Sequence, residues 1–208
     1  EVIRGALQTR PLGLKNTDVK AMSAAGYHTC KHNIRAHASP LHNGFVPTRN
    51  FLNNIVTLDA RARIYATLNP LPHDPTTWTD EQIRRCPLLW FTDFGAAFPS
   101  LLHQWLHLVC ESSRLPRGLH NLIKGTLFCA FAAGAVVDKL IPLFFIFVGS
   151  IQGCPLAAIS FMVGFDPFLK MMSKLIISPD AGVIRACADD VGGAARNAVT
   201  LRPIARIF

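Results

Sequence analysis

Three aspartates stand where short apolar segments end, and carboxylates in such places can bind divalent metal ions. The apolar run at residues 87–92 leads into Asp93, while Asp189 and Asp190 separate two further apolar runs. A charge at the end of a buried strand is costly to desolvate unless water, a cation or an ion pair compensates it. Mg²⁺ prefers oxygen ligands, and two such ions about 4 Å apart can activate an attacking hydroxyl and stabilise a leaving oxygen. The three carboxylates are therefore candidates for a shared two-metal site.

The aspartate pair has a simpler interpretation when it is taken alone. Asp189 and Asp190 are typical of an ordinary hairpin turn, for which aspartate is a favoured residue. A third aspartate at a separate strand end, followed five residues later by Phe98, favours the metal site instead.

The elements that must position these aspartates are short strands and helices in irregular order. Hydrophobic patterning predicts four strands, at residues 87–92, 143–148, 183–188 and 191–195. It predicts helices at residues 16–38, 49–66, 101–110 and 155–175, with a loop at residues 69–79. The last two strands form a hairpin with the aspartate pair at its turn, and Pro167 indicates a kink or break in the last helix. Because regular βαβ alternation and internal repeats are lacking, an α+β fold is expected.

The charge balance favours a negatively charged partner. Twenty-one Lys and Arg residues face thirteen Asp and Glu residues, for a formal net charge of +8. Basic residues are spread through the N-terminal half, which suits a lined groove better than a basic tail. A basic protein without such a partner remains the alternative.

The cysteines and the apolar segments bear on location. Six cysteines lie far apart without a CxxC pair or metal-ligand spacing, which favours free thiols and no disulfide-linked partner. No signal segment is visible, so we expect an intracellular protein, in the nucleus or cytoplasm, that is not secreted. Mean hydropathy is +0.28, but the most apolar region, residues 126–148, is interrupted by Asp138, Lys139 and Pro142. Its pieces are shorter than the roughly 20 residues of a membrane span, so no membrane association is expected.

Five segments resemble motifs of one enzyme family. ACADD at residues 186–190 resembles the (F/Y)xADD hairpin of reverse transcriptases, especially of the non-LTR retrotransposon and group II intron branch. The other four segments are TRPLGLKNTDVK (9–20), GFVPTRN (44–50), FTDFGAAF (91–98) and GSIQGCPLAAISF (149–161). They are similar to the RPI(S)LxNxDxK, GFxPxR, DFxxAF and (V/I)xQGxPLSPxLF segments of that family. All five occur in family order and cover nearly the whole chain.

The resemblance implies a right-hand polymerase fold with an antiparallel palm sheet, whose catalytic hairpin packs on helices. Residues 1–86 would be mainly fingers, and residues 87–208 an incomplete palm with further fingers elements before residue 149. The implied activity is RNA-directed DNA synthesis, a nucleotidyltransferase reaction in which a primer 3′-hydroxyl attacks the α-phosphate of a dNTP. The implied partners are an RNA template, a DNA or RNA primer and dNTP. The implied cofactor is a pair of Mg²⁺ ions, with Mn²⁺ as a possible substitute.

The resemblance also assigns roles to individual residues. Asp93 and Asp189 would ligate the metals with Asp190 next to them, and Phe98 would lie under the nucleotide sugar and exclude a 2′-hydroxyl. At the remaining matched positions, Arg10 would contact the triphosphate. Gln152 and Gly153 would lie at the mouth of the nucleotide pocket.

Plainer roles stay open for several of these positions. Phe98 could be a core residue, the Gln152–Gly153 pair a turn, and Arg10 a solvated arginine. Lys20 and Arg49 also match motif positions. For both, a structural role and contact with the template backbone are equally open.

Some positions depart from the family pattern. Pro99 stands where many relatives have a second aspartate, and Ala157 and Ala158 replace Ser-Pro. The family's lysine segment, primer grip and thumb would lie beyond Phe208, so we expect a fragment that is inactive or nearly so alone. Two alternatives remain: a degenerate, non-catalytic retroelement remnant that only binds nucleic acid, and a polytopic membrane protein.

Overall fold

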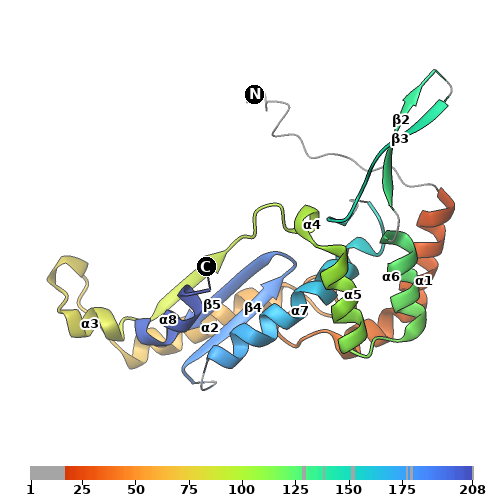
Figure 1. The fold of residues 1–208 in the computed structure, drawn as a ribbon. Coiled ribbons are helices and arrows are strands. Elements are labelled where there is room, and N and C mark those ends of the chain that lie inside the picture. Colours follow the sequence, from red (N-terminus) through yellow and green to blue (C-terminus); the bar gives the residue numbers. More distant parts are fainter. Residues whose placement is uncertain are drawn as a thin grey trace.

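A computed structural model describes residues 17–127, 130–137, 139–150, 153–176, 178 and 180–207. The helices are α1 (Thr17–His37), α2 (Leu52–Leu68), α3 (Asp80–Arg85), α4 (Ala97–Ser100), α5 (His103–Ser112), α6 (Arg117–Leu127), α7 (Ala157–Leu175) and α8 (Ala198–Ala205), with a 3-10 turn at Pro75–Thr77. The strands are β1 (Leu88–Thr92), β2 (Phe131–Val136), β3 (Lys139–Phe145), β4 (Gly182–Cys187) and β5 (Asp190–Ala195). This mixture of helices and antiparallel sheet confirms the predicted α+β class (Figure 1).

A three-stranded antiparallel sheet with the order β1-β5-β4 forms the centre of one end of the molecule. Leu88 faces Ala195 and Thr92 faces Val191 across the β1–β5 pair. The central strand carries Gly192 and Gly193, and a side chain at Gly193 would collide with the Trp90 ring. Small residues in β5 therefore let the large side chains of β1 lie across it.

The two faces of this sheet are covered by different helices. Because successive strand residues point to opposite faces, Ile184 and Val191 pack with Leu169 and Met172 of α7 and Ile204 of α8. The opposite face meets α2, whose residues Leu58 and Tyr65 pack against Ala194 and Val183. The sheet is thus held between α7 and α8 on one side and α2 on the other.

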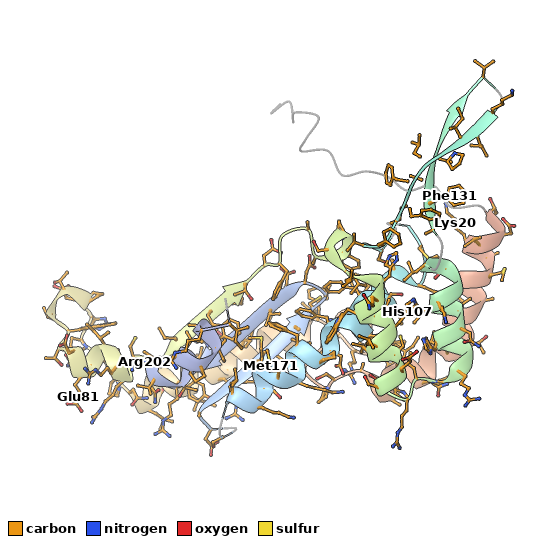
Figure 2. The ribbon with its side chains drawn as sticks, viewed as in Figure 1. Lys20, Glu81, His107, Phe131, Met171 and Arg202 are labelled. Carbon is orange, nitrogen blue, oxygen red and sulfur yellow. The ribbon has the colours of Figure 1, made fainter. Side chains whose placement is uncertain are left out.

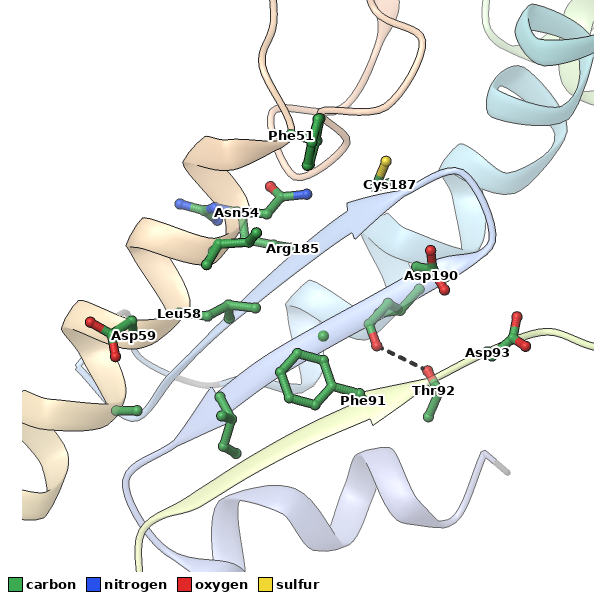
Figure 3. Close-up of a pocket in the computed structure, with 15 residues that line it drawn as sticks. Phe51, Asn54, Leu58, Asp59, Phe91, Thr92, Asp93, Arg185, Cys187 and Asp190 are labelled. Atoms are coloured by element: carbon green, nitrogen blue, oxygen red, sulfur yellow. Dashed lines mark hydrogen bonds between the residues drawn. The ribbon is translucent and has the colours of Figure 1, made fainter.

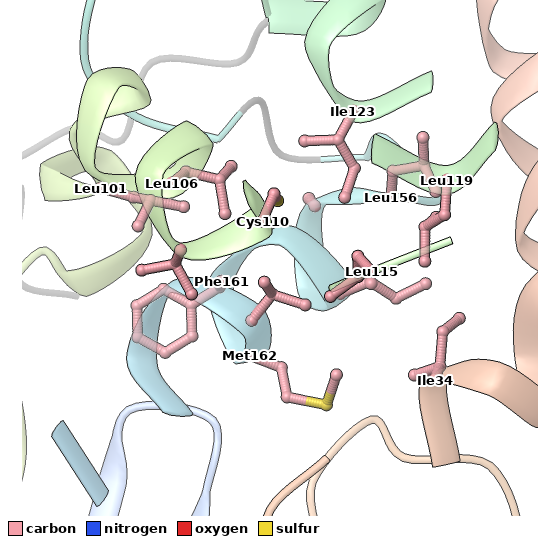
Figure 4. Packing of buried hydrophobic residues seen from close by; sticks show 14 of the residues in the cluster. Ile34, Leu101, Leu106, Cys110, Leu115, Leu119, Ile123, Leu156, Phe161 and Met162 are labelled. Atoms are coloured by element: carbon pink, nitrogen blue, oxygen red, sulfur yellow. The ribbon is translucent and has the colours of Figure 1, made fainter. Parts of the chain in front are cut away.

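A second core joins α5, α6 and α7, with α1 at its edge (Figure 4). Leu119, Ile123 and Leu127 recur every four residues on α6 and are all buried. They belong to the same cluster as Leu106 of α5, which is fully buried. This spacing is typical of an amphipathic helix, yet no element was predicted there from the sequence.

The strands β2 and β3 form a separate hairpin that extends away from the helices (Figures 1 and 2). The sequence predicted a strand at residues 143–148, whereas β3 ends at Phe145 and begins at Lys139. Pro142 is accommodated where the register with β2 shifts between Ala132 and Ala133. Among the described residues, no helix has the length and apolarity needed to cross a membrane.

Two further expectations need correction. Of the predicted kink or break at Pro167, the break is absent, since α7 continues to Leu175. The Trp105 indole N–H donates to the Gly164 carbonyl at 2.8 Å, in the helical turn that precedes the proline. The helix predicted from Arg49 begins only at Leu52; the Asn50 side chain accepts a hydrogen bond from the Leu52 N–H, and the N-cap residue Phe51 makes no side-chain cap hydrogen bond.

We expect Leu169→Ala to destabilise the fold by about 2–5 kcal/mol, because its fully buried side chain joins α7 to the sheet. Met171→Ala on the same helix is the matched control, since Met171 is largely exposed and its truncation should cost at most about 0.5 kcal/mol. Urea unfolding monitored by circular dichroism measures both. Equal losses of unfolding free energy in the two variants would show that α7 does not anchor the sheet through the face that carries Leu169.

The α5–α6 contact should weaken in mild acid. The rings of His107 and His120 lie 6.0 Å apart, and Nδ1 of His107 and Nε2 of His120 are buried without a hydrogen-bond partner among the described residues. Burial, followed by the positive charges of His120, Lys124 and His103, lowers the pKa of His107. The unfolded chain therefore takes up this proton more readily, and stability should fall as the pH drops below about 6.5.

Thermal unfolding between pH 7.5 and 5 checks this expectation. His107→Gln should reduce the acid-side loss of melting temperature, whereas His28→Gln, at an exposed position of α1, should leave it unchanged. A His107→Gln protein with the wild-type pH slope would contradict the assignment.

Candidate metal centre

The pairing of β1 with β5 brings Asp93 and Asp190 to one end of the sheet (Figure 3). Thr92 faces Val191, so one step further along the same register Asp93 stands opposite Asp190. By the alternation of each strand, both lie on the face that carries Phe91 and Gly192 and looks toward α2. Facing residues of an antiparallel pair have their Cβ atoms about 4.5–5.5 Å apart.

Asp189 lies in the tight turn that joins β4 to β5. Cys187 pairs with Asp190, which leaves only Ala188 and Asp189 between the strands. Ala188 has a φ of 55°, in the left-handed region that non-glycine residues rarely adopt. The predicted hairpin is thus confirmed, with Asp189 in its turn and Asp190 as the first residue of β5.

The three carboxylates interact electrostatically. Burial, followed by the negative charges of Asp189 and Asp93, raises the pKa of Asp190. Within the part of the chain that the structure describes, none of the three forms an ion pair. Their mutual repulsion is therefore left for a bound cation or solvent to relieve.

The donor chemistry fits Mg²⁺, whereas the convergence of the donors is incomplete. Carboxylate oxygens are the ligands that this ion prefers. Among the described residues, however, no three His, Cys, Asp or Glu side chains converge closely enough to hold an ion. Asp93 and Asp190 share an edge with Asp189 beside them, and binding an ion in common would require their side chains to turn toward one another.

A cavity of about 620 Å³ adjoins the carboxylates, between α2 and the sheet (Figure 3). Its lining is mostly apolar, with Phe51 just before α2, Leu58 on α2 and Phe91 on β1. The polar residues of the lining include Thr92 beside Asp93, as well as Asn54, Cys187 and Arg185. Burial and the nearby Arg61 lower the pKa of Arg185.

Phe98 lies on α4, and contacts with other aromatic rings, rather than with the sheet, fix its side chain. Its ring stacks on Phe161 of α7 with centroids 4.5 Å apart and meets Phe45 edge-on at 6.4 Å. Its carbonyl accepts a hydrogen bond from the Ser150 N–H at 2.9 Å. Phe98 thus connects the end of the β1 segment to the start of the 149–161 motif, and it is only partly buried.

Of the other residues singled out by the motifs, the structure describes some and not others. Gly153 has a φ of 84°, so its conformation itself favours glycine. Arg10 and Gln152 lie outside the described residues. Lys20 lies on α1 at a partly exposed position (Figure 2).

Arg49 has a structural role in the contacts that the structure shows. Its guanidinium donates to the carbonyl oxygens of Arg35, Ala38, Ser39 and His42 at distances between 2.5 and 3.3 Å. These bonds close the C-terminal end of α1, where carbonyls lack helical partners.

Sequence reasoning did not reveal that the loop before α2 lies against the β4–β5 hairpin. His42 forms an isolated parallel bridge with Ala186. The Asn54 side-chain amide donates to the Ala186 carbonyl at 3.0 Å, and Asn43 donates to Asn54 at 2.6 Å. The GFVPTRN motif beside these residues was the available signal, but it did not reveal which of them would be buried.

Comparisons with known proteins bear on the fold. No family model matches the sequence, and no curated protein matches it. A solved structure of apo telomerase from Candida tropicalis is similar with a TM-score of 0.59 at 10% sequence identity. The similarity covers 92% of this chain and 33% of that chain, so this chain spans about a third of the telomerase chain. Telomerase is related to reverse transcriptases, and at this identity the likeness concerns architecture alone. The chain therefore has a reverse transcriptase-like fold.

Proposed function

We propose that the chain is the fingers and palm part of an RNA-directed DNA polymerase of the non-LTR retrotransposon or group II intron type. The observation that carries the proposal is the β1–β5 register, which sets Asp93 opposite Asp190 on one face with Asp189 in the adjoining turn. The five motif resemblances support it as well, and the telomerase-like architecture supports its reverse transcriptase-like fold. Its partners would be an RNA template, a primer and dNTP.

In this proposal the carboxylates hold divalent cations. Two bound Mg²⁺ ions would supply activation of the primer hydroxyl and stabilisation of the leaving oxygen. Asp93 and Asp189 would bind them, and Asp190 would add negative charge beside them. The raised pKa of Asp190 supports this role, since proximity to two carboxylates disfavours its ionised form until a cation is present.

The remaining residues would hold the nucleotide. Phe98 would present its ring to the sugar, supported from behind by Phe161. Gly153 would let the backbone approach the nucleotide closely. The excess of basic residues would attract the phosphate backbones of template and primer, with a strength that falls as salt is added.

Substituting the proposed ligands should weaken cation binding selectively. We expect Asp93→Asn and Asp189→Asn each to weaken Mn²⁺ binding at pH 7.5 by at least about tenfold, or about 1.4 kcal/mol. Isothermal titration calorimetry measures this. Asp59→Asn is the matched control, because Asp59 lines the same cavity but pairs with Arg63 at 2.8 Å and lies on α2.

Primer extension on an RNA template by the full-length reading frame that contains this chain, with and without Mg²⁺, tests the reaction itself. Incorporation that requires Mg²⁺ and disappears in Asp189→Asn supports the polymerase. RNA binding without Mn²⁺ binding or incorporation would favour the alternative of a remnant that only binds nucleic acid. The incomplete convergence of the carboxylates is the observation that keeps this alternative in the test.

Phe98 should determine the choice between deoxyribonucleotides and ribonucleotides. We expect Phe98→Ala to reduce the preference for dNTP over rNTP by about tenfold, since the ring would otherwise exclude the 2′-hydroxyl. The measurement is competitive binding of the two nucleotides in the presence of Mn²⁺, because a ratio does not depend on how much protein is folded. An unchanged ratio would leave Phe98 as the packing partner of Phe161.

A further inference from the structure

The loop between α1 and α2 extends the catalytic sheet by a short stretch of pairing. The Asn43 N–H donates to the Ala186 carbonyl, and the Ala186 N–H donates to the Leu41 carbonyl, both at 2.9 Å. These bonds place His42 beside Ala186 in parallel orientation. The loop is therefore hydrogen-bonded to β4 immediately before the turn that carries Asp189.

The closest approach is between Gly44 and the turn itself. A Cβ on Gly44 would lie 2.7 Å from the Ala188 nitrogen and 2.8 Å from the Cys187 Sγ. No side chain fits at that distance, so the loop backbone rests directly on the turn. Ala188, which the loop contacts, is the residue held in the left-handed conformation.

His42 is buried completely at this junction. Its side chain has a relative exposure of 0%, and within the described part of the chain neither ring nitrogen has a hydrogen-bond partner of ordinary geometry. Backbone groups of Gly44 and Ala188 and the charge of Asp166 act to raise its pKa, but burial outweighs them and lowers it. Asp166 on α7 and Arg49 on the loop are the charged groups that act on the ring.

If the side chain at position 42 only filled space, a histidine would not be expected here. A buried polar group without partners is costly, and a leucine would fill similar volume without that cost. The support around His42 is fixed as well, because Arg49 binds the His42 carbonyl at 2.8 Å and Asp166 accepts from the Ser39 N–H at 2.9 Å. The backbone around His42 is thus held rigidly by hydrogen bonds. The polar atoms of the ring lie near the Ala188 backbone.

We propose that His42 is a positioning residue that holds the Ala188–Asp189 turn in its left-handed conformation and so sets the direction of the Asp189 carboxylate. This role rests on the proposed metal site for its functional meaning. His42 would touch neither substrate nor metal, and would act only through the backbone of the turn.

Hydrogen exchange of the turn tests the proposal without relying on activity. We expect His42→Leu to speed amide exchange in a peptide spanning residues 186–191 by at least about tenfold, with exchange in α5 unchanged. His42→Gln, which retains polar atoms at similar reach, should preserve most of the wild-type protection. Tyr65→Leu is the control for general destabilisation, since Tyr65 is a buried residue that packs on Ala194, farther along β5 from the turn.

The outcomes separate the two proposals. Unchanged exchange at the turn in His42→Leu, or faster exchange spread evenly through the chain as in Tyr65→Leu, would overturn the role of His42. If His42→Leu does not fold, His42→Asn takes its place: it shortens the reach of the polar atoms toward the turn, so turn protection equal to that of the wild type would also overturn the role. Mn²⁺ titration of the wild type judges the metal site separately, and its failure would remove the proposed function while the exchange data still decide whether His42 holds the turn.

Discussion

The antiparallel pairing of β1 with β5 is the constraint on which the candidate site depends. Asp93 and Asp190 are far apart in the chain, and only the register of these two strands sets them opposite each other. A slip of one residue would turn every side chain of β1 to the other face and carry Asp93 away from α2. The register is held because Trp90 and Phe91 lie over Gly193 and Gly192, where larger residues would not fit. The glycines of β5 are thus part of how the carboxylates are aligned.

The helices fix this register from both sides. Leu169 and Met172 of α7 bind the face that carries Ile184 and Val191, while Leu58 of α2 reaches the opposite face at Gly192. The α2 face is left open toward the carboxylate end, where the cavity lies. A closed sheet face thus provides rigidity, and the open one provides access to the aspartates.

Local patterns predicted the elements near the carboxylates well, because those strands are short apolar runs with clear ends. The β4–β5 hairpin and the end of β1 at Thr92 follow directly from their sequences. In contrast, β2 is rich in alanine and glycine, which have low strand propensity, so its pairing with β3 carries little local signal. The helix α3 was also missed, although the capping box of Thr79 and Gln82 is readable in the sequence. The burial of His42 could not be predicted, because it arises from contacts with residues more than a hundred positions away.

The β2–β3 hairpin has a consequence for how the chain behaves at high concentration. Every residue of β3 is exposed, and the hairpin and its flank carry large apolar side chains that include Leu140, Leu143 and Phe144. A two-stranded ribbon also presents unpaired N–H and C=O groups along both outer edges. Such a ribbon is a template for strand addition by another molecule, and in β3 only Lys139 and Pro142 oppose that addition. The chain by itself should therefore associate through this ribbon as concentration rises, and charged substitutions at Leu140 and Phe144 are the natural way to keep it monodisperse.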